Sequence, residues 1–256
     1  NITPNRGDCL SVRGIARDLA AAGLGTLKEN NLIKSIPGTF ESPIKWKKDF
    51  SGDKEYLCPG VAGRYFKNVT NKQSPEWLQQ RLKAIGLRPI SALVDITNYI
   101  TYDLGRPLHV YDADKLNGNL KMRFAKENET CLTLDEENRE CKSDMIVIAD
   151  DKKLHGIGGL MGGLDSGCSL DTKNVFLEVA LFDPISVTKT GRHFKLLSDA
   201  RYRFERGIDP SSIEWGVNAA TNMINDLCGG EVSNTVQTKT LENKQSKINF
   251  NTTKVK

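Results

Sequence analysis

The sequence predicts an α+β fold, with a mixed or antiparallel β-sheet core, flanking helices and short pieces of neighbouring domains at both ends. Helix-like segments lie before residue 107 and after residue 182, whereas short apolar or alternating runs fill most of the span between them. Because helices and strands do not alternate regularly, a doubly wound parallel sheet is disfavoured. The length of 256 residues suits a single main domain.

The first predicted element is a helix over residues 8–23. Asp8 is its expected cap, apolar residues recur behind it at helical spacing, and Gly23 ends it. The polar stretch GTLKENN follows and indicates a boundary. Residues 1–38 are therefore expected to be the end of a preceding domain with its linker.

Two helices are predicted after the strand-like runs IKWKK and GVAGRYFKNV. Ser74 caps the first helix, Pro75 is its first residue and Gly86 closes it; the second follows Pro89. Their expected core positions are Leu78, Leu82 and Ile85 in the first helix and Leu93, Ile96 and Ile100 in the second.

A pattern typical of β-strands extends from Pro107 to Phe182, where the runs KMRFA, DMIVIAD and VFLEVALF are separated by polar and glycine-rich turns. The stretch DPISVTKTGR returns to helix. A last helix is predicted with Asp209 as cap and Pro210 as first residue, and Gly229 follows its apolar face.

Composition restricts the class of protein. The net charge of +4 permits nucleic-acid binding but does not indicate it, because basic and acidic residues are interspersed. The six cysteines lack C-x-x-C spacing and suit reduced, cytoplasmic thiols, and three scattered histidines do not argue for a metal site. No apolar run approaches the roughly 20 residues needed to cross a membrane. The chain begins with Asn1, which favours a fragment of a longer protein.

The glycine cluster HGIGGLMGG (residues 155–163) does not match a nucleotide-binding loop. Met161 stands where G-x-G-x-x-G requires its third glycine, and no G-K-[ST] follows. Tight turns or close backbone approach, including approach to a ligand, explain these glycines better.

Two polar segments leave alternatives open. In VDITNYITYDLGRPLHVYD, Asp95 is expected to cap and bridge the helix-to-strand corner, whereas for His109 a structural and a functional role are evenly balanced. In LLSDARYRFERGIDP, the arginines are either part of a surface salt-bridge network or line a path for a phosphate backbone.

Glu178 is the single acid in the predicted buried strand VFLEVALF. Alternation places its side chain on one face with Phe176, Ala180 and Phe182, which suggests an apolar pocket with one polar end. The alternative is a glutamate buried by pairing with an arginine, the candidates being Arg192, Arg201, Arg203 and Arg206.

Five ordered motifs resemble the beta subunit of bacterial phenylalanyl-tRNA synthetase: TPNRGDCLSVRGIARDLAA, LVDITNYITYDLGRPLHVYDADKL, LMGGLDSG, FLEVALFDP and LLSDARYRFERGIDP. The resemblance assigns residues 39–243 to the editing module of that subunit and residues 244–256 to the start of the following domain. It implies hydrolysis of tyrosine wrongly esterified to the phenylalanine tRNA.

The resemblance also implies functional residues. Catalytic roles fall on His109, Thr97, Asn98 and Gly159, and substrate-binding roles on Glu178, Ala180, Ser198 and Ala200. Glu178 is expected to read the phenol hydroxyl of tyrosine. His109 would orient water or the terminal adenosine, Thr97 and Asn98 would hold substrate groups, and backbone N–H groups near Gly159 would stabilise the oxyanion.

Two positions depart from the family pattern. Gly158 stands where many members have alanine, which is expected to loosen the loop, and Arg201 stands where serine or histidine is commoner, which is expected to add charge at the pocket rim.

The same resemblance implies partners and cofactors. The partners are the 3′ end of the phenylalanine tRNA and the alpha subunit of a heterotetramer, with no membrane involved. This segment needs no cofactor or metal, whereas the parent ligase uses ATP and magnesium elsewhere. The alternative function is a non-catalytic RNA-binding or assembly module of the same subunit.

Overall fold

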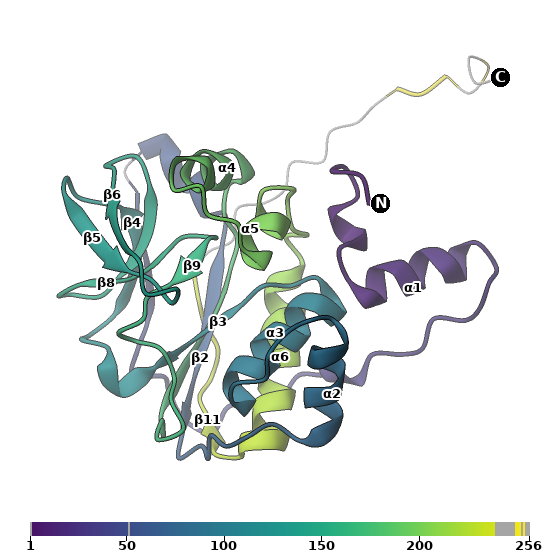
Figure 1. Ribbon diagram of the computed structural model, residues 1–256, viewed down its shortest axis with the longest axis horizontal. Helices are drawn as coiled ribbons and strands as arrows, with labels where there is room; N and C mark the ends of the chain where they lie inside the picture. The colour runs from purple at the N-terminus through teal and green to yellow at the C-terminus, as the bar shows by residue number, and fades with distance from the viewer. Residues whose placement is uncertain (1, 51, 239–248, 252, 254–256) are drawn as a thin grey trace.

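The computed structural model describes residues 2–50, 52–238, 249–251 and 253 (Figure 1). Within these residues the chain forms a mixed sheet, an antiparallel sheet and a layer of helices. The predicted α+β class is therefore confirmed. The domain boundary expected between residues 243 and 244 lies outside the described residues, and the boundary at residue 38 stays a prediction.

The mixed sheet has the strand order β1-β4-β7-β8-β9, in which β1 runs parallel to β4 and the other pairs are antiparallel. Its strands are β1 (Trp46–Asp49), β4 (Leu120–Phe124), β7 (Ile146–Ala149), β8 (Leu154–Ile157) and β9 (Met161–Gly162). A separate hairpin joins β5 (Glu129–Leu132) to β6 (Asn138–Cys141).

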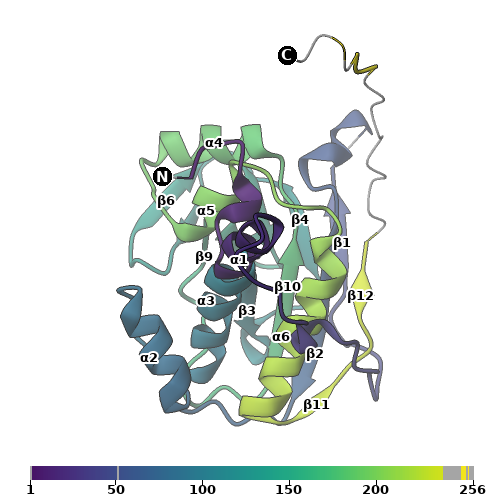
Figure 2. The same ribbon diagram turned by 90° about the vertical axis from the view of Figure 1, so that its right-hand side faces the viewer.

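The second sheet is antiparallel and has the order β11-β2-β10-β3, with β12 also paired to β2 (Figure 2). Its strands are β2 (Val61–Lys67), β3 (His109–Asp112), β10 (Val175–Ala180), β11 (Glu231–Val232) and β12 (Val236–Gln237). Strand β10 is central, between β2 and β3.

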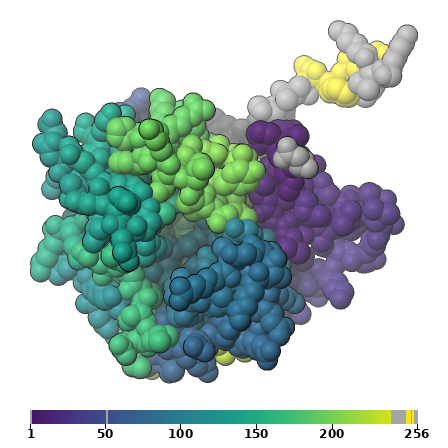
Figure 3. All heavy atoms as spheres, in the orientation of Figure 1, coloured from purple at the N-terminus to yellow at the C-terminus, as the bar shows by residue number. Residues whose placement is uncertain are grey.

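Helices α3 (Ala92–Leu104) and α6 (Ser212–Cys228) lie against the antiparallel sheet, with α2 (Glu76–Ala84) outside α3. Helices α4 (Pro184–His193) and α5 (Asp199–Phe204) lie near the mixed sheet. Short 3₁₀ turns occur at Gly7–Cys9, Asn31–Ile33, Gly52–Leu57 and Ala113–Lys115. The N-terminal segment, with α1 (Val12–Ala21), forms a lobe at one side of the molecule (Figure 3).

Strand β10 separates two apolar cores and is buried along its whole length. Leu177 and Val179 belong to the core shared with α3 and α6, whereas Phe176 and Ala180 belong to the core between the two sheets. The alternation predicted for this strand is confirmed. Glu178 therefore projects toward the space between the sheets rather than toward the helices.

The predicted helices are present, but three of their caps were wrong. Ser11, not Asp8, caps α1 by accepting a hydrogen bond from the Gly14 N–H at 2.9 Å. The Asp8 carboxylate instead pairs with Arg6, at 2.9 Å, and with Arg17. Because the Asp8 carboxylate pairs with two arginines, it does not cap the helix as the local sequence suggested.

The other two misassigned caps lie at the starts of α2 and α6. The Ser74 hydroxyl donates to Asp95 on α3 instead of capping α2, whose N-cap is Pro75. Asp209 precedes the first residue of α6 by three positions and accepts hydrogen bonds from the N–H and hydroxyl of Ser211. No helix among the described residues has the length and apolar character needed to cross a membrane.

Asp95 bridges two elements as expected, but it joins the start of α2 to the start of α3 rather than a helix to a strand. Its side chain is fully buried and accepts hydrogen bonds from the Ser74 hydroxyl and, at 2.9 Å, from the Ile90 N–H. We expect Asp95→Ala to lower the free energy of unfolding by about 2–4 kcal/mol, because the buried Ser74 hydroxyl and the part-buried Ile90 N–H both lose their acceptor.

Urea denaturation of the purified chain measures this loss. Asp226→Ala is the matched control, because Asp226 is an exposed aspartate on a helix. Equal denaturation midpoints for the two variants would contradict the role given to Asp95.

Candidate functional site

A cleft of about 80 Å³ opens between the two sheets, with β3 and β10 on one side, the β8–β9 hairpin on the other and α5 at its edge. Most of its lining is apolar, and three side chains bring polar chemistry to it: the carboxyl group of Glu178, the imidazole of His109 and the hydroxyl of Tyr111. The other lining residues used below are Gly159, Leu160, Met161, Gly162, Ala180, Phe182, Ala200 and Phe204.

The register of the antiparallel sheet brings Glu178 and His109 together. They are direct cross-strand partners in the β10–β3 pair, so their side chains lie on one face. On the other neighbour, β2, Glu178 is opposite Gly63. A Cβ atom at Gly63 would lie 2.6 Å from Trp46 Nε1 and 2.9 Å from Phe176 Cζ, so the indole occupies the space that a side chain there would need.

Glu178 is 6% exposed, and the hydroxyl of Tyr111 donates a hydrogen bond to its Oε2 atom. Burial raises the pKa of Glu178 from 4.5 to about 7, because an apolar surrounding disfavours the charged carboxylate. The Tyr111 hydrogen bond and the positive charge of Arg106 act in the opposite direction. The group is thus poised to gain or lose a proton near neutral pH.

Arg106 is a buried cation close to this carboxylate. It is fully buried and donates hydrogen bonds to the backbone carbonyls of Ala180 at 2.6 Å, Pro107 at 2.7 Å and Ser212 at 3.4 Å. Burial lowers its pKa to about 9. Arg106 therefore fastens the end of β10 to the segment before β3 while contributing positive charge beside Glu178.

The proposed arginine partners of Glu178 were wrong. In the described ranges no ion pair joins Glu178 to any arginine, and Tyr111 is the partner instead. Arg201 Nε pairs with Glu205 at 3.0 Å, and Arg203 pairs with Asp199 at 3.3 Å. These two contacts also favour the salt-bridge interpretation of the arginine segment over a path for phosphates.

Arg201 does not add free charge at the cleft, contrary to expectation. It is 8% exposed, is neutralised by Glu205 and donates to the Leu196 carbonyl at 2.5 Å. A Cβ atom at Gly191 would lie 2.3 Å from Arg201 Nε, so α4 leaves room for the guanidinium inside the fold.

His109 contributes a neutral imidazole to the cleft. Burial lowers its pKa from 6.5 to about 4, and its Nε2 atom is buried without a hydrogen-bond partner among the residues that the structure describes. Its ring contacts the Tyr111 ring edge-to-face, with 4.5 Å between centroids. Gly162 makes room for the ring, since a Cβ atom there would lie 2.3 Å from His109 Cε1.

The glycine cluster forms the turn between β8 and β9, as the tight-turn interpretation predicted. Gly159 has φ +72°, a left-handed conformation that favours glycine, and a Cβ atom there would lie 2.8 Å from Val187. At Gly158, Cβ would lie 2.9 Å from both Ile146 and Phe182. Gly158 therefore allows the Phe182 ring to lie close to the turn, and the expected loosening of the loop stays a prediction.

The structure brings five of the eight predicted site residues to the cleft: His109, Gly159, Glu178, Ala180 and Ala200. Ser198 lies just outside as the N-cap of α5, where its hydroxyl accepts from Arg201 N and donates to the Leu160 carbonyl at 2.7 Å. Thr97 and Asn98 do not line the cleft. They lie half-buried on α3, whose buried face contacts the core through Leu93, Ile96 and Ile100.

Sequence reasoning missed Tyr111 and Arg106. The period of two along HVYD places Tyr111 on the same face as His109, and that signal was available. No local signal places Arg106, because two of its three acceptors, the carbonyls of Ala180 and Ser212, lie 74 and 106 residues away along the chain.

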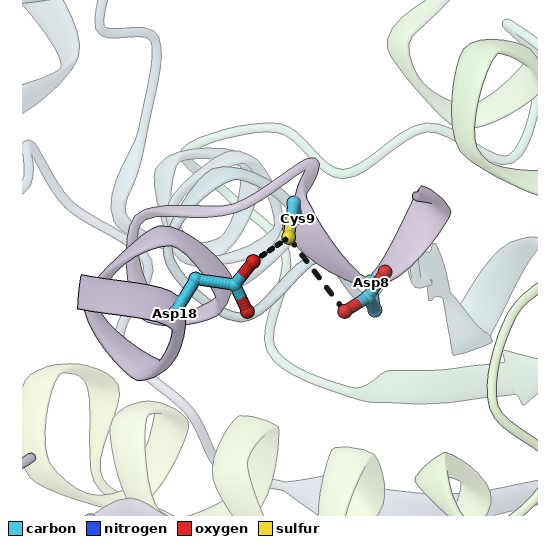
Figure 4. Close-up of side chains that lie close together, drawn as sticks. All are labelled: Asp8, Cys9 and Asp18. Atoms are coloured by element: carbon cyan, nitrogen blue, oxygen red, sulfur yellow. Dashed lines mark hydrogen bonds between the residues drawn. The ribbon is translucent and has the colours of Figure 1, made fainter. Parts of the chain in front are cut away.

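One further cluster of potential metal ligands lies away from the cleft, where Asp8, Cys9 and Asp18 converge (Figure 4). The guanidinium of Arg6 occupies this place, with its NH2 atom 2.9 Å from Asp8 and 2.6 Å from Asp18. An arginine that already neutralises both carboxylates competes with a cation, so the cluster is an ion-pair network.

Comparison with known proteins assigns the family. Residues 57–229, which include the antiparallel strands β2, β3 and β10 and the whole cleft, match the B3/4 domain. The phenylalanine–tRNA ligase beta subunit of Brucella suis is 53% identical over 230 residues, which are 90% of this chain and 28% of that protein. That of Mesorhizobium japonicum is 54% identical over 235 residues, 92% of this chain and 29% of that protein.

A solved N-terminal fragment of the phenylalanyl-tRNA synthetase beta subunit from Pyrococcus horikoshii gives a TM-score of 0.46 at 15% identity, over 90% of this chain and 60% of that one. This weak likeness adds nothing to the assignment. The chain spans a little over a quarter of the length of its curated relatives. By its domain match and its close sequence relatives, the chain belongs to the B3/4 domain family and resembles the corresponding segment of phenylalanine–tRNA ligase beta subunits.

Proposed function

We propose that this domain hydrolyses tyrosine wrongly esterified to the phenylalanine tRNA, and that Glu178 recognises the tyrosine phenol. The observation that carries the proposal is a buried carboxyl group in an otherwise apolar cleft, already in contact with one phenol hydroxyl, that of Tyr111. The names of the sequence relatives support the choice of tRNA.

Glu178 supplies the selectivity that an editing site needs. Tyrosine and phenylalanine differ by one hydroxyl, and an apolar pocket alone rejects the larger amino acid poorly. A buried carboxylate reverses the preference, because tyrosine donates a hydrogen bond to it whereas phenylalanine leaves it short of a partner. That difference amounts to about 1–3 kcal/mol, and more for a charged group.

The hydrolysis itself assigns roles to the remaining groups. Water attacks the ester carbonyl carbon, the bond to the ribose oxygen breaks, and tyrosine and a free ribose hydroxyl are released. His109 has a neutral imidazole with an unpartnered Nε2 atom, so it can orient the water or take its proton. The backbone N–H of Gly159 would stabilise the developing oxyanion, since those of Gly158 and Leu160 already donate to the Ile146 and Ile157 carbonyls.

The small residues Ala180 and Ala200 leave room for the amino-acid ring, and Ser198 holds the edge of the cleft through Leu160. Thr97 and Asn98 lie apart from these groups, so a role for them requires contact with the tRNA rather than with the amino acid.

The proposed editing activity belongs to a larger enzyme, a phenylalanine–tRNA ligase. Aminoacylation with ATP and magnesium would take place outside this chain, with the alpha subunit and the 3′ end of the tRNA as partners. A purely RNA-binding role finds less support, because Arg201 and Arg203 are engaged in internal ion pairs.

The first test is Glu178→Ala. We expect the ratio of tyrosyl-tRNA to phenylalanyl-tRNA hydrolysis to fall by roughly tenfold to a few hundredfold, since the phenol loses its acceptor. Rates are measured with both charged tRNAs. Glu231→Ala, at an exposed strand position, is the control. An unchanged ratio in Glu178→Ala would falsify the recognition role, and tRNA binding without release of tyrosine by the unmodified protein would favour the RNA-binding alternative.

The second test fills the cleft from α5. Ala200→Trp is expected to reduce tyrosyl-tRNA hydrolysis at least tenfold, because an indole would take the space of the substrate ring. The matched control is Ala84→Trp, at the exposed end of α2. Deacylation at the normal rate by Ala200→Trp would show that the amino acid binds elsewhere.

The third test uses pH. Because Glu178 keeps its proton up to a pKa of about 7, its ionised form, which makes the stronger hydrogen bond, is populated above that value. The tyrosyl-to-phenylalanyl ratio should therefore rise between about pH 6 and pH 8. Each rate is corrected for spontaneous hydrolysis. Glu178→Gln has no titrating carboxyl group, so a rise of equal size in that variant would contradict this explanation.

A further inference from the structure

One of the two carboxylate oxygens of Glu178 is already occupied. The Tyr111 hydroxyl donates to Oε2, and the Tyr111 side chain is 1% exposed. The contact is diagonal across the β3–β10 pair, because Tyr111 is registered with Phe176 and Glu178 with His109. Both hydrogen-bonding groups thus project from the central sheet, where their backbone positions are fixed on two neighbouring strands.

We propose that Tyr111 is a positioning residue for the discriminating carboxylate: its hydroxyl holds Glu178 Oε2 and leaves Oε1 as the acceptor for the phenol of the substrate. This inference rests on the proposed function and deepens it. A carboxylate with one oxygen held has a defined orientation, so it presents a single acceptor site to the cleft instead of two interchangeable ones.

The ring of Tyr111 is itself held in place by two imidazoles. His109 contacts it edge-to-face at 4.5 Å between centroids, and His155 contacts it edge-to-face at 6.3 Å. His155 in turn lies beside the buried carboxylate of Asp150, with its Nε2 atom 2.7 Å from Oδ2. Tyr111 therefore contacts both the Glu178 carboxylate, which recognises the phenol, and the His109 imidazole, which orients the water. These contacts can hold the carboxylate and the imidazole at a fixed separation.

The groups around Glu178 show why the Tyr111 hydrogen bond affects the ionisation of its carboxyl group. The titratable groups that face it are Tyr111 and His109 on β3, Arg106 before β3 and Cys58 before β2. Cys58 keeps its proton because burial raises its pKa to about 12, the pKa of Tyr111 is raised well above 10, and His109 is neutral. Tyr111 as donor and Arg106 as cation are the groups that favour the ionised form of Glu178.

The test is Tyr111→Phe, which removes the hydroxyl and keeps the ring. The titration of Glu178 is followed by NMR of ¹³C-labelled glutamate, with its signal assigned by its loss in Glu178→Gln. The midpoint is expected to move to higher pH. The tyrosyl-to-phenylalanyl ratio should fall roughly fivefold to tenfold at neutral pH, because the carboxylate is both less ionised and no longer held in one orientation.

Two further variants of this protein complete the experiment. Tyr65→Phe removes a half-buried hydroxyl from the same sheet without touching the cleft, and should change neither readout. Site-specific 3-fluorotyrosine at position 111 keeps the hydroxyl and makes it a stronger donor. This substitution is therefore expected to move the Glu178 midpoint to lower pH in a protein whose packing is almost unaltered.

The outcomes separate this inference from the proposed function. An unmoved Glu178 midpoint in Tyr111→Phe, or a higher tyrosyl preference caused by release of a competing phenol, would overturn the positioning role. If the unmodified protein releases no tyrosine from mischarged tRNA, the proposed function fails. In that case the titration midpoint of Glu178 still tests the inference. A shift to higher pH in Tyr111→Phe and to lower pH with 3-fluorotyrosine would support the hydrogen bond from Tyr111 to Glu178, even though the proposed function had failed.

Discussion

A carboxyl group placed on the central strand of a sheet needs a hydrogen-bond partner, because burial alone makes its charged form unfavourable. In this domain the partner is the Tyr111 hydroxyl, with Arg106 adding positive charge nearby. The rest of the cleft depends on this contact. Without it, Glu178 would be an uncompensated acid between two apolar cores.

The sheet arrangement makes such a placement possible. Strand β10 is covered by α3 and α6 on one face and by the mixed sheet on the other, so a side chain on the second face is shielded from bulk water. Gly63 on β2 provides space for Trp46 and Phe176, while His109 on β3 completes the row. A neutral imidazole and a carboxyl group that titrates near pH 7 thus share one small, mostly apolar cleft.

Local sequence patterns predicted which side chains of a strand or helix are buried, because burial follows the period of each element. The period of two along β10 gave the face of Glu178, and helical spacing gave the buried residues of α3. The hydrogen bond from Tyr111 could not be predicted in this way, because it depends on the register between strands more than sixty residues apart. The caps expected at Asp8 and Asp209 failed for a different, local reason: these carboxylates bind neighbours two residues away, Arg6 and Ser211.

The resemblance to a known family contributed what periodicity could not, namely a reason for an acid in that strand. It named eight site residues, and the fold brings five of them to one cleft. The remaining three belong to helix α3 or to the cap of α5. Their separation from Glu178 shows that residues grouped by a family motif need not share a cavity in the isolated domain.

The Ser198 hydroxyl takes part in two structures at once, since it caps the first turn of α5 and donates to the Leu160 carbonyl in the β8–β9 turn. Because α5 has six residues, its cap is a large part of what keeps it folded. The same hydroxyl therefore fastens this short helix, which carries Ala200, to the glycine turn at the wall of the cleft. One oxygen atom thus joins helix and turn, because it accepts a hydrogen bond from the first and donates one to the second.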